Sequence, residues 1–121
     1  MRRVARGVAE SMGASASVDF RVNFAPLVND PEQADFALSV CRDLVGAPQV
    51  VTDAPLIMAS EDFSYMLEKV PGCFINIGNG TGSQGGCMVH NAGYDFNDRV
   101  LSTGATYWVK LVERWLAPQA G

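Results

Sequence analysis

The chain has 121 residues, of which 48% are apolar and 18% charged, with a net charge of −4. These values fit one globular domain and exclude both two full-sized domains and a disordered polypeptide. The negative charge argues against nucleic-acid binding, which needs concentrated Lys and Arg, and no apolar run approaches the roughly 20 residues of a membrane helix. Arg2, Arg3 and Arg6 form the only basic cluster, which we interpret as a solvated helix face.

The cysteines indicate the compartment. Cys41, Cys73 and Cys87 are odd in number, widely spaced and without a CxxC pair. This pattern is not typical of a disulfide framework or a thiolate zinc site. We therefore expect a reducing, cytoplasmic environment.

The start of the chain predicts a helix followed by a strand. Apolar residues recur at helical spacing at Val4, Val8 and Met12. Gly13 stands where a left-handed residue is expected to end the helix. From Ser17 to Phe24 apolar and polar residues alternate. The alternation predicts a strand with one buried and one wet face, as in an antiparallel sheet, ended by Pro26.

A second helix is predicted to begin at Asn29-Asp30-Pro31-Glu32, which combines an Asx cap, a proline in the first turn and an acidic residue. Gly46 is expected to end it. Its apolar stripe comprises Phe36, Ala37, Val40, Cys41, Leu44 and Val45. Val50-Val51 is a short strand candidate.

The next predicted helix is capped by Ser60, carries Glu61 and Asp62 in its first turn, and packs through Phe63, Met66 and Leu67. Cys73 to Ile77 then predicts a buried strand. Five glycines between Gly78 and Gly86 indicate a loop, and irregular structure is expected to continue to Asp98.

Asn97 or Asp98 is expected to cap the last helix, which Pro118 closes. One broad apolar face is predicted for this helix: Val100, Leu101, Gly104, Trp108, Leu111, Val112 and Trp115. Helices and strands thus alternate along the chain, which favours an α/β architecture. The half-wet first strand differs from the buried later ones, so we place a domain boundary between Pro26 and Asp30.

Few residues offer chemistry. Gly80 to Gly85 matches GxGxxG, but no helical pattern follows it, so we reject a dinucleotide site. His90 is the only histidine. It is either a hydrogen-bonded structural residue or a metal ligand, and one imidazole cannot hold a metal without further ligands.

The acidic residues near these segments also have two interpretations. Asp95 is a candidate second-shell acceptor for His90, whereas Asp98, Glu61 and Asp62 are simply explained by helix starts. Cys87 lies close to His90 in the sequence and leaves a Cys–His hydrolase open as a lower-ranked hypothesis.

Several segments carry motifs that point to one family. Met58 to Phe63 reads M-A-S-E-D-F, Val70-Pro71-Gly72 is followed by Ile77 to Gly80, and His90 to Asp98 reads HNAGYDFND. These segments resemble the M-x-S-E-D-F, VPG…GNG and HN-x-x-YDFND motifs of the peptidase M20 amidohydrolases, which include the hippurate hydrolases and N-acyl-amino-acid deacylases. Ala92 stands where a proline is common in the family, and Pro26 to Asp30 also has a family counterpart.

The resemblance implies an α/β fold in which residues 26–121 form the C-terminal portion of a metal-dependent catalytic domain. Residues 1–25 would be the last helix and strand of an inserted α+β lid or dimerisation domain. His90 would be the last ligand of a centre of two divalent metals, zinc, manganese or similar. The general base and the other ligands would lie upstream of the residues present here.

The resemblance further implies that Ser60, Gly78, Asn79 and Gly80 line the substrate side, and that the protein is a homodimer through its lid domain. The expected activity is hydrolysis of the amide bond of N-acyl or N-aroyl amino acids by the intact protein. This chain by itself is expected to be inactive. The alternative is a non-catalytic interaction module derived from the same fold. Neither nucleic acid nor membrane is an expected partner.

Overall fold

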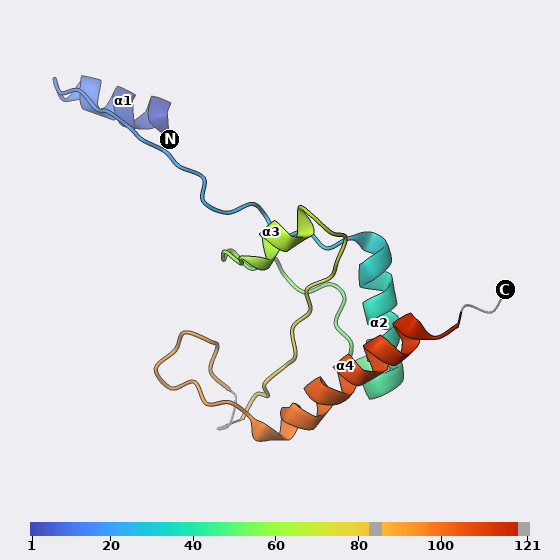
Figure 1. The fold of residues 1–121 in the computed structure, drawn as a ribbon. Helices are drawn as coiled ribbons and strands as arrows, with labels where there is room; N and C mark the ends of the chain where they lie inside the picture. Colours follow the sequence, from blue (N-terminus) through green and yellow to red (C-terminus); the bar gives the residue numbers. More distant parts are fainter. Residues whose placement is uncertain (83–85, 119–121) are drawn as a thin grey trace.

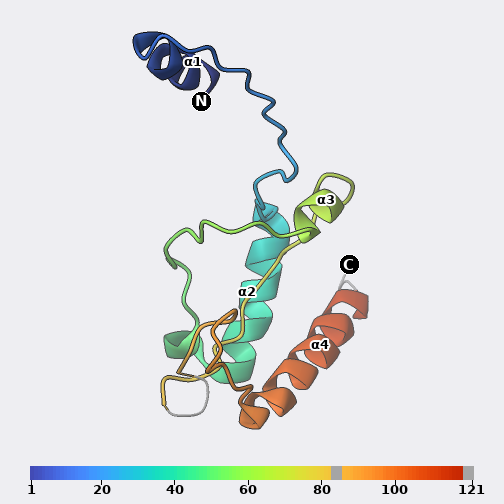
Figure 2. The ribbon, with the colours of Figure 1, turned by 90° about the vertical axis from the view of Figure 1, so that its left-hand side faces the viewer.

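The computed structural model describes residues 1–82 and 86–118. In chain order the elements are α1 (Arg2–Ser11), α2 (Pro31–Val45), the 3-10 turn η1 (Ala47–Gln49), α3 (Phe63–Leu67), the 3-10 turn η2 (Asp98–Val100) and α4 (Leu101–Leu116). α2 packs against α4, and α3 lies near the start of α2, whereas α1 stands apart on a long connection (Figures 1 and 2). We call everything from α2 to α4 the body.

Helix α1 ends as the sequence predicts. Gly13 has a φ of +70°, its N–H donates to the Glu10 carbonyl at 3.0 Å, and the Ala14 N–H donates to the Ala9 carbonyl at 2.9 Å. This pair of bonds is a Schellman motif. The predicted apolar stripe, however, is exposed, with Val4 at 66%. Among the helices that the structure describes, none packs against α1.

Helix α2 also begins and ends as predicted. The Asp30 carboxylate accepts a hydrogen bond from the Gln33 N–H at 3.1 Å, Pro31 occupies the first turn, and Gly46 has a φ of +83°. Here the apolar stripe is buried at its centre, where Val40 is 1% exposed. In α2, therefore, both the predicted helix ends and the predicted burial of the apolar stripe are observed.

Helix α4 begins through η2, where the Asn97 side chain accepts a hydrogen bond from the Arg99 N–H at 3.2 Å, as expected of a cap. Tyr107, 5% exposed, is the buried residue of this helix. Trp115 meets Phe36 of α2 edge to face, with ring centroids 5.3 Å apart. Trp108 and Trp115 nevertheless stay more than half exposed, so the predicted apolar face is covered only in part.

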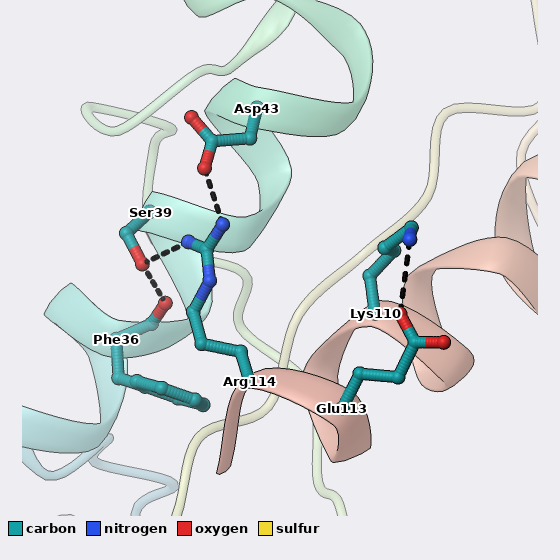
Figure 3. A network of polar contacts seen from close by, with 6 residues as sticks. All are labelled: Phe36, Ser39, Asp43, Lys110, Glu113 and Arg114. Carbon is teal, nitrogen blue, oxygen red and sulfur yellow. Dashed lines mark hydrogen bonds and ion pairs between the residues drawn. The ribbon is translucent and has the colours of Figure 1, made fainter. Parts of the chain in front are cut away.

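A polar contact also joins these two helices. Figure 3 shows Arg114 of α4 reaching α2, where its guanidinium pairs with Asp43 and donates to the Ser39 hydroxyl at 3.0 Å. Ser39 in turn donates to the Phe36 carbonyl at 2.7 Å. The neighbouring pair, Lys110 and Glu113 at 2.9 Å, lies within α4 and joins no second element.

The strand predictions are wrong for the described residues, which contain no β-strand. Ser17–Phe24, Val50–Val51 and Cys73–Ile77 are all irregular, and the alternating Phe20, Val22 and Phe24 are exposed rather than half buried. A strand exists only when a neighbouring strand accepts and donates its backbone hydrogen bonds. The described part is therefore mostly helical, which corrects the α/β expectation for this chain taken alone.

In the Cys73–Ile77 segment, the backbone of Phe74 bonds a side chain, that of Asn29, in the way it would bond a neighbouring strand. The side-chain amide of Asn29 donates to the Phe74 carbonyl at 2.9 Å and accepts from the Phe74 N–H at 2.8 Å. The Asp30 N–H donates to the Gly72 carbonyl at 3.0 Å. The start of α2 is thereby attached to this segment.

The expected start of α3 also needs correction. α3 begins at Phe63, and Ser60 lies outside it without capping it; the Phe63 N–H instead donates to the Glu61 carboxylate at 3.3 Å. Met66, expected to pack, is 62% exposed, and Ser64 is the buried residue. The side of α3 that faces the body is therefore the one that carries Ser64, and not the one that carries Met66.

Candidate functional site

The segment carrying His90 is a turn built from backbone and asparagine hydrogen bonds. His90 has a φ of +67°, the only positive φ outside glycine in the part of the chain that the structure describes. The Asn91 N–H donates to the Met88 carbonyl at 3.3 Å, and the Tyr94 N–H donates to the Asn91 carbonyl at 3.0 Å. The Gly93 N–H donates to the Asn91 side chain at 2.8 Å. The turn exposes the His90 residue to solvent.

The base of this loop is joined across the sequence. The Asn79 amide donates to the Asp95 carbonyl at 2.8 Å and accepts from the Asn97 N–H at 2.9 Å, while the Asn97 amide donates to the Asn79 carbonyl at 3.1 Å. The structure thus attaches Asn79, predicted to face substrate, to the loop that bears His90. The sequence predicted Asn97 as a helix cap but did not predict its hydrogen bonds to Asn79, because the two residues are far apart in the chain.

The other predicted substrate residues are placed differently. Gly78 has open space where a side chain would be, and Gly80 has a φ of +109°, a conformation that favours glycine. Ser60 is exposed in the segment before α3. In both ribbon views α3 and the orange loop that contains residues 87–97 lie toward opposite ends of α2 (Figures 1 and 2). The chain does not bring Ser60 and the His90 loop together.

The carboxylate expected behind His90 is also exposed. Asp95 takes part in the site through its backbone carbonyl, and no hydrogen bond joins its carboxylate to His90 within residues 1–82 and 86–118. In the same ranges no three His, Cys, Asp or Glu side chains are grouped closely enough to hold a metal ion. An exposed imidazole fits one position of a metal centre, and the described residues do not complete the set.

The three thiols fall into two classes. Cys41 and Cys73 are half buried in the body, and burial raises the pKa of each thiol; for Cys73 the neighbouring Cys41 adds to the rise. Cys87, in the His90 loop, is exposed. A nucleophilic Cys87 would need a neighbouring group that stabilises its thiolate, and the described residues show none. Solvent exposure of Cys87 is therefore the one observation that supports the Cys–His hypothesis.

Two apolar hollows are found among the described residues, and some of the residues that line them were predicted from the sequence to be core. The larger, about 650 Å³, lies between α2, α4 and the segment 73–75, with Phe36, Phe74, Trp108 and Trp115 among its lining residues. The smaller, about 340 Å³, lies between the His90 loop and the start of α4 and is lined by Ile77, Asn79, Tyr94, Phe96, Val100, Leu101, Gly104 and Ala105. For the larger hollow, the signal in the sequence was the pair of tryptophans on α4, Trp108 and Trp115.

Comparison with known proteins defines the class. The family model described as "Peptidase family M20/M25/M40" matches residues 4–114. The chain belongs to that M20 family. The resemblance expected from the motifs around residues 58–63 and 90–98 is thereby confirmed.

Individual relatives agree with this assignment. The hippurate hydrolase of Campylobacter jejuni is 27% identical over 114 residues, which are 94% of this chain and 29% of the relative. The IAA-amino acid hydrolase ILR1-like 2 of Arabidopsis thaliana is 34% identical over 110 residues, 88% of this chain and 25% of the relative. The N-acetyldiaminopimelate deacetylase of Streptococcus suis is 33% identical over 79 residues, 64% of this chain and 20% of the relative.

The chain therefore spans between a fifth and a third of the length of these curated relatives. No solved structure matches it significantly. No helix in the described part of the chain has the length and apolar character that crossing a membrane requires.

Proposed function

We propose that the intact protein hydrolyses the amide bond of N-acyl or N-aroyl amino acids in a metal-dependent reaction to which this chain contributes His90 as a metal ligand. The observation that carries the proposal is the M20 match over residues 4–114, which includes the His90 turn. Hippurate, IAA-amino acids and N-acetyldiaminopimelate, the compounds in the relatives' names, are all amino acids acylated on nitrogen.

The proposed centre holds two divalent ions, zinc, manganese or similar, which in such enzymes polarise the amide carbonyl and lower the pKa of a bound water. Within this chain the exposed imidazole of His90 is the group that would contact one of them. The remaining ligands and the general base belong to parts of the protein outside these 121 residues. In the assembled centre the Asp95 carboxylate would orient the His90 imidazole by accepting a hydrogen bond from it.

Four residues of this chain are proposed to face the substrate: Ser60, Gly78, Asn79 and Gly80. Gly78 leaves the backbone accessible to a close approach, since nothing lies within 4 Å of a Cβ atom built on it, and Gly80 has a φ of +109° that favours glycine. Ser60 would approach from the other end of the body. The side-chain amide of Asn79 also bonds the His90 loop.

The proposed domain arrangement follows the same resemblance. Residues 1–25, with α1 apart from the body, would belong to a lid domain that dimerises, and residues 26–121 to the catalytic domain. The exposed apolar residues of α1 and of the 17–24 segment are compatible with burial in such a domain. The three free cysteines are compatible with a reducing, cytoplasmic compartment.

The decisive experiment measures metal content and hippurate hydrolysis for this chain and for the polypeptide extended upstream through its reading frame. We expect hydrolysis and about two metals per chain only in the extended form, both reduced by His90→Ala. Asn76→Ala, an exposed position near the loop, serves as the matched control. Hydrolysis that survives His90→Ala would contradict the proposed role of this residue.

One observation favours a second function. The 650 Å³ hollow along α2 and α4 is apolar and open, as in a surface that binds another polypeptide. If both forms of the protein fold, hold no metal and hydrolyse nothing, a non-catalytic interaction module becomes the better account.

A further inference from the structure

The four hydrogen bonds made by the side chains of Asn79 and Asn97 join three parts of the body. The side-chain nitrogen of Asn79 donates to the Asp95 carbonyl, and its side-chain oxygen accepts from the Asn97 N–H. The side-chain nitrogen of Asn97 donates to the Asn79 carbonyl, and its side-chain oxygen accepts from the Arg99 N–H at the start of α4. The segment before the glycine loop, the loop carrying His90 and the last helix therefore meet at this pair.

The pair joins two residues that are 18 positions apart in the sequence. Bringing the ends of such a loop together costs conformational entropy, and the glycines within it enlarge the set of conformations that must be given up: Gly80, Gly82, Gly85, Gly86 and Gly93. No regular strand pairing is available to the described residues here. The two side-chain amides supply hydrogen bonds that a β-ladder would otherwise provide.

We propose that Asn79 and Asn97 are positioning residues that hold the base of the His90 loop and so fix the direction in which the imidazole is presented. Asn91 completes the device by holding the turn at the apex. The inference rests on the proposed function in one respect, the role of His90 as a metal ligand. The fixed loop geometry itself does not depend on that role.

The structure offers variants that separate loop fixation from helix capping. Asn97→Asp keeps the oxygen that accepts from Arg99, and aspartate caps helices as well as asparagine does, but it removes the amide donor to Asn79. Asn79→Asp keeps the acceptor for the Asn97 N–H and removes the donor to Asp95. Asn76→Ala changes an exposed residue of the same segment and serves as the control.

The first test uses nuclear magnetic resonance on the chain as it stands. Asn79→Ala is expected to speed amide hydrogen exchange at Asn97 by roughly five- to tenfold, the effect of one lost hydrogen bond, whereas Asn79→Asp keeps the acceptor and should change this exchange less. Both variants are expected to weaken the intraresidue HN–Hα nuclear Overhauser effect of His90, which is strong at a positive φ because the two protons then lie close together. Asn97→Asp should weaken the same effect while α4 keeps its helicity. Unchanged exchange in Asn79→Ala and an unchanged His90 effect in all three variants would overturn the proposal.

The second test measures zinc affinity by competition with a chromophoric chelator, in the upstream-extended protein. Loss of a residue that orients a ligand typically weakens metal binding 10- to 100-fold, which we expect for Asn79→Ala but not for Asn76→Ala. If His90→Ala weakens zinc binding and Asn79→Ala does not, the positioning role is wrong. If His90→Ala has no effect, the proposed function fails, and the magnetic resonance result still decides whether the loop is held by this pair.

Discussion

Helices α1 and α2 illustrate how differently two helices with similar end signals can be used. Both stop at a glycine with positive φ, Gly13 and Gly46, and both carry apolar residues at helical spacing. Val40 of α2, a helix that packs against α4, is 1% exposed, whereas Val4 of α1 is 66% exposed. Local signals therefore define where a helix begins and ends, while its contribution to stability depends on the element that covers its apolar face.

The strongest test of this comparison is one chemical change made in both helices. Val40→Ala removes two buried methyl groups and should lower the free energy of unfolding of the body by about 2 kcal/mol, including the cavity left behind. Val4→Ala should change it by less than about 0.5 kcal/mol. Urea unfolding followed by tryptophan fluorescence measures both. Equal effects would mean that α1 is covered in solution.

Alkaline pH should weaken the body by a slightly smaller amount. Burial, and then the nearby thiols of Cys41 and Cys73, raise the pKa of Tyr107 from 10.0 to about 12. The unfolded chain then loses this proton first, so the stabilisation is complete below pH 10 and declines as the pH rises toward 12. At pH 11 the loss attributable to Tyr107 should be about 1–2 kcal/mol relative to pH 8.

The two half-buried thiols act in the same direction, because burial also raises the pKa of Cys41 and Cys73 above 9.0. In Tyr107→Phe the loss of stability between pH 8 and pH 11 should therefore be smaller, because the part due to the phenol is absent and the part due to the thiols remains. Urea midpoints at pH 8 and pH 11 for both proteins provide the comparison. An identical pH dependence in Tyr107→Phe would show that the phenol is not responsible.

Changes at helix ends should have intermediate effects that again differ between the two regions. Asp30→Ala removes the acceptor of the Gln33 N–H and should destabilise the body by about 1 kcal/mol. Gly13→Ala places a side chain at a φ of +70° and should fray α1 without moving the unfolding midpoint of the body. Circular dichroism at low denaturant should show a small loss of helix for Gly13→Ala and no loss for Asp30→Ala. The urea midpoint should fall for Asp30→Ala and stay unchanged for Gly13→Ala.

The smallest expected effect concerns the ion pair between α2 and α4. Arg114→Ala removes contacts to Asp43 and Ser39 that are partly solvent-exposed, and should cost between about 0.2 and 1 kcal/mol at low salt. Lys110→Ala breaks a pair within α4 only, and should cost less. Urea midpoints in low salt and in 0.5 M NaCl measure both, and the difference between the variants should shrink as salt screens the charges.

The features that were predictable share one property, which is that their causes lie within a few residues. The Asp30 cap, the Gly13 and Gly46 helix ends and the Asn97 cap all depend on hydrogen bonds to neighbours up to about five residues away. The family resemblance was likewise predictable, because its motifs lie in contiguous segments, and the match over residues 4–114 confirms the family.

The features that were not predictable depend on distant partners. Ser17–Phe24 has the alternation of a strand, but no partner lies beside it in the described residues. The bonds from the Asn79 side chain to positions 95 and 97 were not predicted, because no residue near Asn79 in the sequence indicates them. Ser64, a polar residue in a helix, is buried with its hydroxyl unpaired among the described residues, which no local pattern indicated.

By itself, the sequence determined the family of this chain, the ends of its main helices and the singular status of His90, since motifs, caps and helix-ending glycines act locally. Only the tertiary structure decided which apolar faces are covered, that the predicted strands remain unpaired, and that Asn79 and Asn97 hold the His90 loop. These outcomes depend on contacts between residues far apart in the chain, and the free energy of such contacts depends on what lies alongside them in space rather than on the residues next to them in sequence.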